Sequence, residues 1–115
     1  MRKSLTKKQI IRSKTDIDSL FKAGKKYSSS CFKLLVRENS LPYSRLIVIP
    51  VRHFGNSVRR NKIRRQIKEI WRLNQEKILP GLDCAFIVYT DSDLSYIKKE
   101  EILIDLLNRS GSLRG

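Results

Sequence analysis

The side chains best suited to bind another molecule lie between Arg52 and Arg72, in a segment that opens with a turn and continues with dense positive charge. From Ser57 to Arg72 the chain places seven lysine or arginine residues against one glutamate, a formal charge of +6. The cations are Arg59, Arg60, Lys62, Arg64, Arg65, Lys68 and Arg72. Guanidinium and ammonium groups at this density are suited to neutralising phosphates. Anion binding is therefore the chemistry that this segment indicates.

The same segment is predicted to form an amphipathic helix. Gly55-Asn56-Ser57 is a turn-and-cap signal, in which Asn56 or Ser57 can accept from the first free backbone N–H groups. The apolar positions that fall along one stripe of a 3.6-residue wheel are Ile63, Ile67, Ile70 and, at its margin, Trp71. The stripe is expected to pack in the core, which leaves the cations outside it available for binding.

Taken alone, this helix would carry several electrostatic conflicts. Arg59 and Arg60 lie in the first turn, at the positive end of the helix dipole, where a cation costs about 0.3–1 kcal/mol. Like-charge pairs four residues apart each cost about 0.2–0.5 kcal/mol, and at that spacing only Arg65 with Glu69 offsets them. Together these conflicts would lower the stability of the fold by roughly 1–3 kcal/mol, a penalty expected only where a function requires it. A polyanion would remove this penalty, and a face that is merely solvated is the alternative.

The composition of the whole chain also favours a nucleic-acid partner. The 115 residues are expected to form one domain, and 25 lysine and arginine residues against 11 aspartate and glutamate residues give a formal charge of +14 and a pI near 10.3. Binding to an anionic membrane would need a broader apolar face, and no stretch approaches the ~20 apolar residues of a membrane span. The basic N-terminus lacks the apolar block of a secretory signal, so the expected location is the cytoplasm.

Hydrolysis by the protein's own side chains is disfavoured. The lone histidine, His53, has no obvious nucleophile beside it, and neither a G-x-S-x-G motif nor a glycine-rich phosphate loop is present. The acidic pairs Asp16/Asp18 and Asp91/Asp93 fit a helix start and a turn, where aspartate serves local capping roles. A nuclease that acts without a partner is therefore the weakest of the functions considered.

The cysteines and most aromatic residues are expected in the core. Cys31 and Cys84 lie in apolar segments, which indicates buried thiols, and together with His53 they are too few for a structural zinc site. No metal site is predicted. The aromatic residues interpreted as core rather than as base-stacking groups are Phe21, Tyr27, Phe32, Trp71 and Tyr89.

Residue patterns along the chain predict the elements that hold the basic helix. Residues 1–11 are expected to be a basic arm that is extended or poorly ordered. The predicted elements are a helix from Lys14 to Gly24 with Thr15 as its N-cap, a turn over Lys25–Ser30, strands over 32–37, 45–51 and 83–89, and a last helix over 97–108. Pro50 places the second of these strands at a sheet edge or a bulge. A basic helix between two strands indicates an α/β or α+β fold with three or four strands.

The stretch Gly55–Arg65 resembles the signature of the bacterial ribonuclease P protein family, a G-N-x-V-x-R-N-R-I-K-R run at the start of a basic helix. Phe21–Gly24 resembles the family's F-K-x-G at the end of its first helix, and Asp83–Val88 resembles its last strand. The resemblance covers nearly the whole chain. It implies a single small α+β sandwich in the order α-β-β-β-α-β-α, with a mixed sheet and a left-handed βαβ crossover, similar to the second domain of ribosomal protein S5.

The resemblance also implies a role beside a catalytic RNA. In this family the RNA, with bound magnesium ions, removes the 5′ leader from precursor tRNA, while the protein binds that RNA and contacts the leader. The residues that would contact the catalytic RNA are Arg59, Arg60, Asn61, Lys62, Arg64, Arg65 and Lys68. The residues that would form the leader-binding cleft are Arg12, Ile17, Phe21, Leu35, Arg52 and His53. The protein would contribute no catalytic residue, and magnesium would be held mainly by the RNA.

Four positions depart from the family pattern. Ile17 and Leu35 stand where cleft aromatics are common, so apolar contact would replace part of the stacking on the leader. His53 stands where a lysine is common and is largely neutral at pH 7. Lys62 replaces an arginine, which keeps the charge and loses the bidentate fork.

A ribosomal or general RNA-binding protein with the same basic helix is the alternative function.

Overall fold

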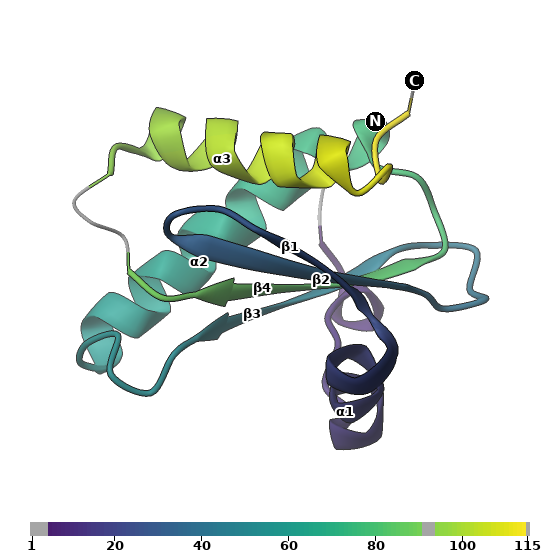
Figure 1. The fold of residues 1–115 in the computed structure, drawn as a ribbon, viewed down its shortest axis with the longest axis horizontal. Coiled ribbons are helices and arrows are strands. Elements are labelled where there is room, and N and C mark those ends of the chain that lie inside the picture. Colours follow the sequence, from purple (N-terminus) through teal and green to yellow (C-terminus); the bar gives the residue numbers. More distant parts are fainter. Residues whose placement is uncertain (1–4, 91–93, 115) are drawn as a thin grey trace.

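The sheet at the centre of the molecule carries helices on both of its faces (Figure 1). The computed structural model describes residues 5–90 and 94–114. The elements, in chain order, are the short 3-10 helix η1 (Lys7–Gln9), α1 (Lys14–Ala23), β1 (Lys25–Ser28), β2 (Phe32–Glu38), β3 (Arg45–Pro50), α2 (Ser57–Asn74), the short 3-10 helix η2 (Gln75–Lys77), β4 (Leu82–Val88) and α3 (Tyr96–Arg109). Apart from the two short 3-10 helices, this is the predicted α+β order.

The strands lie side by side in the order β1-β2-β4-β3, and the sheet is mixed as predicted. β2 pairs antiparallel with both β1 and β4, whereas β3 runs parallel to β4. The parallel pair is joined through α2, which places the basic helix in the connection of a βαβ unit. β3 is an edge strand that ends at Pro50, so the edge position that this proline indicated is confirmed.

β1 is the strand that the residue pattern did not locate. The predicted turn over Lys25–Ser30 is wrong for residues 25–28, which pair with β2 from Lys25 opposite Val36 to Ser28 opposite Lys33. Three of its four side chains are exposed, so the apolar alternation that marks a strand is missing. Main-chain pairing with β2 holds this edge in place of side-chain burial.

Alternation along β2 sorts the interior into two clusters, one on each face of the sheet. Phe32, Leu34 and Val36 share one face and Leu35 lies on the other, as the sequence predicted; the first three pack with α2 and α3, and Leu35 packs with α1. The cluster on the α1 side consists of Ile11, Leu20, Leu35, Ala85 and Ile87. Cys31 and Cys84 are buried free thiols as predicted, and burial raises the pKa of the Cys84 thiol. α1 and α3 therefore lie on opposite sides of the sheet (Figure 1).

The first turn of α1 is capped by a residue other than the predicted one. Ser13 is the N-cap, and its hydroxyl oxygen accepts from the backbone N–H of Asp16 at 3.4 Å, while Thr15 lies inside the helix. Serine and threonine both favour the cap position, so residue type alone did not separate them. Gly24 ends the helix as predicted, and a Cβ there would lie 2.5 Å from the carbonyl oxygen of Leu20.

The segment before α1 is packed against β3 and is not poorly ordered. The predicted extended conformation is wrong for residues 7–9, which form η1, and is observed at Ile10. Ile10 forms a parallel bridge with Leu46, and the N–H of Ile11 donates to the carbonyl oxygen of Leu46 at 2.9 Å. The side chain of Ile11 is 1% exposed, and its burial contributes about 1.5–3 kcal/mol. Residues 1–4 of the predicted arm and the predicted turn over Asp91–Asp93 lie outside the described residues.

Candidate nucleic-acid interface

The start of α2 is fixed by the turn that precedes it. Asn56, one of the two predicted candidates, is the N-cap, and its side-chain oxygen accepts from the backbone N–H of Arg59 at 3.0 Å. The guanidinium of Arg59 lies over the ring of the buried Phe54, 5.7 Å from its centroid. The first turn contains no acidic residue, so nothing in it offsets the positive end of the helix dipole.

The predicted apolar stripe of α2 is buried. Ile63, Ile67, Ile70 and Trp71 are each at most 3% exposed, and the ring of Trp71 meets the ring of Phe86 edge-on with centroids 6.1 Å apart. Because this stripe faces the sheet, the opposite side of the helix faces solvent. Trp71 is confirmed as a core residue.

At least three of the seven cations on α2 are without an ion-pair partner among the described residues. Lys62 and Arg65 are exposed, and Lys68 is half-buried; none of the three forms an ion pair with a described residue. Arg64 donates to the side-chain oxygen of Asn61 at 3.3 Å, which orients the guanidinium without neutralising it. In the part of the chain that the structure describes, no carboxylate offsets the charge of Lys62, Arg65 or Lys68.

Glu69, the carboxylate on α2, turns toward Arg72 rather than Arg65. The two groups form a hydrogen-bonded ion pair three residues apart, and hydrogen bonding from Arg72 lowers the pKa of Glu69. The predicted compensation of Arg65 by Glu69 is wrong, because the carboxylate is already occupied. Arg65 is exposed and forms no ion pair with any residue in the described part of the chain.

Arg60 has a different role from its neighbours. Its guanidinium donates to the carbonyl oxygens of Val51, at 2.6 Å, and Pro50, at 3.1 Å, and the side chain is half-buried. These bonds tie the first turn of α2 to the end of β3. Arg60 was predicted to contact RNA, but its position makes it first a residue that holds the helix in place.

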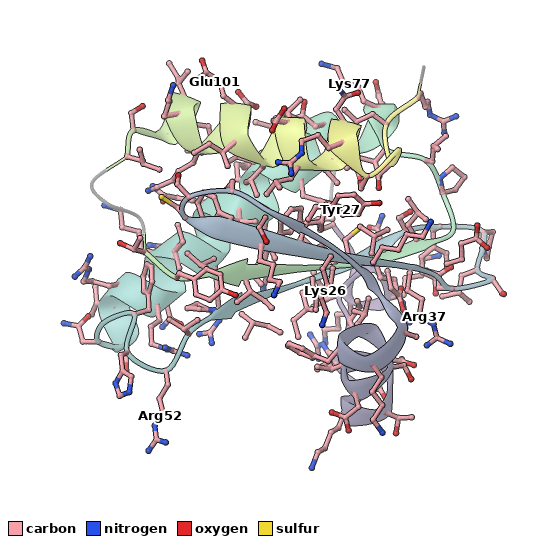
Figure 2. All side chains as sticks on the ribbon, in the orientation of Figure 1. Lys26, Tyr27, Arg37, Arg52, Lys77 and Glu101 are labelled. Carbon is pink, nitrogen blue, oxygen red and sulfur yellow. The ribbon has the colours of Figure 1, made fainter. Side chains whose placement is uncertain are left out.

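The predicted leader residues that lie on α1 or beneath it are Ile17, Phe21 and Leu35. Phe21 on α1 is 42% exposed, which makes the interpretation of this ring as core wrong, and Ile17 is half-buried against the smaller cluster. Arg12, Arg52 and His53 are exposed on the loops before α1 and after β3. Figure 2 shows Arg52 extending from the end of the sheet toward the side on which α1 lies.

Two further side chains are not where the sequence placed them. Leu35 is 1% exposed beneath α1, so it supports the floor of this face and offers no surface for contact with a leader. Tyr89, interpreted as core, is 47% exposed just beyond the end of β4, where burial by the sheet has ended. Tyr27 is half-buried and Phe32 fully buried, in line with their predicted core positions.

Strand register adds residues to this face that were not predicted as part of the site. Lys33 lies opposite Ile87, which in turn lies opposite Ile49, and Lys26 lies opposite Leu35. Alternation along β2 already placed Lys33 on the same side as Leu35, and that signal was sufficient to include it. The row joins the half-buried cation Lys33 to the buried Ile87 and the half-buried Ile49, and a cation beside apolar side chains is the composition expected of a surface for single-stranded RNA.

Arg45 lies at the start of β3 and, unlike Lys62 and Arg65, is neutralised by carboxylates. Its guanidinium donates to both carboxylate oxygens of Asp83, at 2.8 and 2.7 Å, and lies 3.3 Å from the carboxylate of Asp16 on α1. These carboxylates, Asp83 first, raise the pKa of Arg45. The pair fastens α1 to the sheet and removes Arg45 from the groups available to a phosphate.

No protein-held metal site is formed by the described residues, which nowhere bring together three or more His, Cys, Asp or Glu side chains. Asp16 and Asp18 do not form such a site, since Asp16 is engaged by Arg45. None of the helices in the described part of the chain is long and apolar enough to cross a membrane.

Comparison with known proteins places the chain beside one family. The family model described as Ribonuclease P matches residues 5–110. The ribonuclease P protein component of Thermotoga maritima is 39% identical over 87 residues, which cover 76% of this chain and 74% of that protein. The corresponding protein of Clostridium botulinum is 37% identical over 107 residues, which cover 91% and 96% of the two chains. A solved RNase P protein from Thermotoga maritima superposes with a TM-score of 0.80 at 35% identity, covering 86% of this chain and 97% of that one.

Proposed function

The chain belongs to the ribonuclease P protein family, and from this premise we propose that it is the protein subunit of a ribonucleoprotein that removes the 5′ leader from precursor tRNA. In this proposal the RNA subunit carries out the hydrolysis. The protein binds that RNA through α2 and binds the leader through the α1 side of the sheet. It acts in the cytoplasm, where precursor tRNA is processed.

The observation that carries the proposal is that three cations on α2 form no ion pair within the part of the chain that the structure describes. Lys62, Arg65 and Lys68 have no ion-pair partner among the described residues, whereas Arg45, on the sheet, is held by two carboxylates. A protein that needed these charges only for solubility would gain by pairing them, because each unfavourable pair costs about 0.2–0.5 kcal/mol. Phosphates of an RNA supply the missing partners.

The α1 side of the sheet suits a different part of the RNA. A single-stranded leader has no regular groove, so a protein holds it through apolar contact, stacking and phosphate neutralisation. Phe21 and Ile17 supply the apolar surface, Ile49 extends it, and Lys33 and Arg52 supply charge. Neutralising leader phosphates reduces their repulsion from the catalytic RNA, so the assembled complex needs less added cation.

Magnesium belongs to the RNA subunit in this proposal. The described residues offer no cluster of carboxylates for it, and Asp83 and Asp16 are occupied by Arg45. The protein's contribution is therefore to bind and position the two RNAs.

Reconstitution at low magnesium tests the proposal. The purified chain is added to a bacterial ribonuclease P RNA with two substrates, one with a leader of several nucleotides and one that ends one nucleotide before the mature tRNA. We expect cleavage of the long-leader substrate to be stimulated more strongly. Equal stimulation of both substrates would remove the leader assignment, and no stimulation of either would favour a general RNA-binding protein.

A further inference from the structure

A groove of about 250 Å³ runs along the outer edge of β3, between that strand and α2. We call it the edge groove, and its lining residues are Ile10, Ile11, Ile47, Val48, Ile49, Arg64 and Lys68. Five of these are aliphatic and form its walls, while Arg64 and Lys68 are half-buried cations. Half-buried cations of this kind lay their stems along apolar surface and keep their charge at the rim.

Every second residue of β3 directs its backbone N–H and C=O groups toward this groove. Alternate residues of an edge strand direct their N–H and C=O groups away from the sheet. The carbonyl of Leu46 points outward, because it accepts from Ile11, and the N–H of Val51 points inward, because it donates to the carbonyl of Val88 at 2.9 Å. Leu46, Val48 and Pro50 therefore share the outward direction.

Two of these three outward positions are already covered. The carbonyl of Leu46 is bonded to the N–H of Ile11 at 2.9 Å, and the carbonyl of Pro50 is bonded to the guanidinium of Arg60 at 3.1 Å. Val48 lies midway between them and lines the groove. Its outward N–H and C=O have no hydrogen-bond partner among the residues that the structure describes. Val48 as a whole is 5% exposed, so its peptide groups are reached through the groove. Strand edges are normally covered, and a gap flanked by two covered positions therefore marks a place for an external partner.

We propose that the edge groove holds one nucleotide of the single-stranded leader. The base hydrogen-bonds to the peptide N–H and C=O of Val48, and the adjacent phosphate lies between the side chains of Arg64 and Lys68. The inference rests on the proposed function and deepens it, because it extends the leader path from the α1 side of the sheet around the edge of β3 toward α2.

The dimensions and neighbours of the groove favour a leader nucleotide over other occupants. About 250 Å³ is below the roughly 300–1,000 Å³ of pockets that enclose a whole small molecule, and it suits a single base. A base reaches such a groove only from a single strand, where it can be splayed out of the stack. Ile47 and Ile49 also pack against the cluster on the α1 side, so the groove continues the surface assigned to the leader.

Hydrogen exchange at the Val48 amide tests the proposal on the unmodified protein. Exchange is measured by NMR in the holoenzyme bound either to mature tRNA or to precursor tRNA with a leader of several nucleotides. At a precursor concentration ten times its Kd, we expect the Val48 N–H to exchange about tenfold more slowly than with mature tRNA, because only the unbound fraction exchanges. Equal protection with mature tRNA would assign the groove to the catalytic RNA, and no protection in either complex would leave it without a nucleotide; both results overturn the proposal.

Charge removal provides an independent readout. In the holoenzyme assembled at saturating protein, the ratio of the Kd for mature tRNA to the Kd for precursor tRNA measures the contribution of the leader. We expect the Arg64→Ala, Lys68→Ala double variant to lower this ratio about tenfold, and the Lys98→Ala, Arg109→Ala double variant on α3 to leave it unchanged. An equal loss in both variants would contradict a specific groove.

If leader-dependent stimulation persists while Val48 is unprotected, only the edge groove fails; if no stimulation occurs at all, the proposed function itself fails.

Discussion

α2 and α3 pack on the same face of one sheet, yet they treat charge in opposite ways. Both bury an apolar stripe in the larger cluster, and both begin with a side-chain cap, Asn56 for α2 and Ser95 for α3. α2 carries a formal charge of +6, whereas the three cations and three anions of α3 cancel. Similar packing with such different charge shows that a helix can occupy this face without an excess of cations; among the α2 cations, Arg60 bonds to the end of β3.

The cations of α3 are also used differently. Lys98 lies 3.4 Å from the carboxylate of Glu101, and Arg109 lies 3.5 Å from that of Asp105. Lys99 is buried and its ammonium group donates to the side-chain oxygen of Gln66 on α2 at 2.8 Å. Each cation of α3 therefore has a partner within the protein, while Lys62 and Arg65 on α2 have no ion-pair partner among the described residues. The difference points to a partner outside the protein for α2 alone.

Charge reversal on the two helices should separate them most clearly. We expect the Lys62→Glu, Arg65→Glu variant to bind ribonuclease P RNA about a hundredfold more weakly at moderate salt, since two charge-assisted contacts of about 1.4 kcal/mol each are lost. The matched Lys98→Glu, Arg109→Glu variant of α3 should lose less than about threefold. Binding measured by filter retention would contradict the comparison if both variants weakened equally.

Arg60 should behave as a structural residue within α2. We expect Arg60→Ala to lower the free energy of unfolding by about 1–2 kcal/mol, because the carbonyls of Val51 and Pro50 lose their donor. The control Lys62→Ala, at an exposed position, should change it by less than about 0.5 kcal/mol. Urea unfolding measures both variants, and an unchanged midpoint for Arg60→Ala would show that these bonds contribute little.

A small polyanion should stabilise the free protein through α2. Tripolyphosphate at ten times its Kd should raise the free energy of unfolding by about 1.4 kcal/mol, because it neutralises repulsion that the folded state carries. The gain should shrink in a Lys62→Gln, Arg65→Gln variant and persist in a Lys98→Gln, Arg109→Gln variant. Sodium chloride at the same ionic strength serves as the control, and an equal gain in that salt would reduce the effect to general screening.

The smallest expected effect concerns the one carboxylate on α2. Hydrogen bonding from Arg72 lowers the pKa of Glu69 below its ordinary 4.5, so the pair stabilises the folded state above that pH and the stabilisation is lost as pH falls through the lowered value. We expect Glu69→Gln to reduce slightly the acid sensitivity of the unfolding midpoint below about pH 4.5. If the unfolding midpoints of the two proteins follow the same curve as pH falls, this exposed pair contributes nothing measurable to stability.

Much of the fold follows from patterns that are local in the sequence. The stripe from Ile63 to Trp71, the Asn56 cap and the alternation in β2 each depend on spacing within a few residues, and all are observed. β1 was missed because an edge strand can be held by main-chain bonds while its side chains stay polar. Ile11 was assigned to an arm because its cationic neighbours mask a contact with Leu46, 35 residues away.

The site was harder to predict than the fold, because long side chains choose their partners in three dimensions. Arg60 and Arg65 look alike in the sequence, yet one bonds to the end of β3 and the other faces solvent. Leu35 occupies a position assigned to the cleft, but α1 covers it. The helix that carries the charge was evident from the sequence. The role of each cation depends on which groups lie within bonding distance of it in the folded protein.

The salt dependence of RNA binding tests the central claim most directly. If the cations on α2 neutralise phosphates, the logarithm of affinity falls linearly with the logarithm of salt concentration, with a slope of about −0.7 to −0.9 for each phosphate contact. We predict a steep slope for the natural sequence and a slope shallower by roughly 1.4–1.8 for the Lys62→Gln, Arg65→Gln variant. The same slope in both proteins would contradict the claim that these side chains contact the RNA.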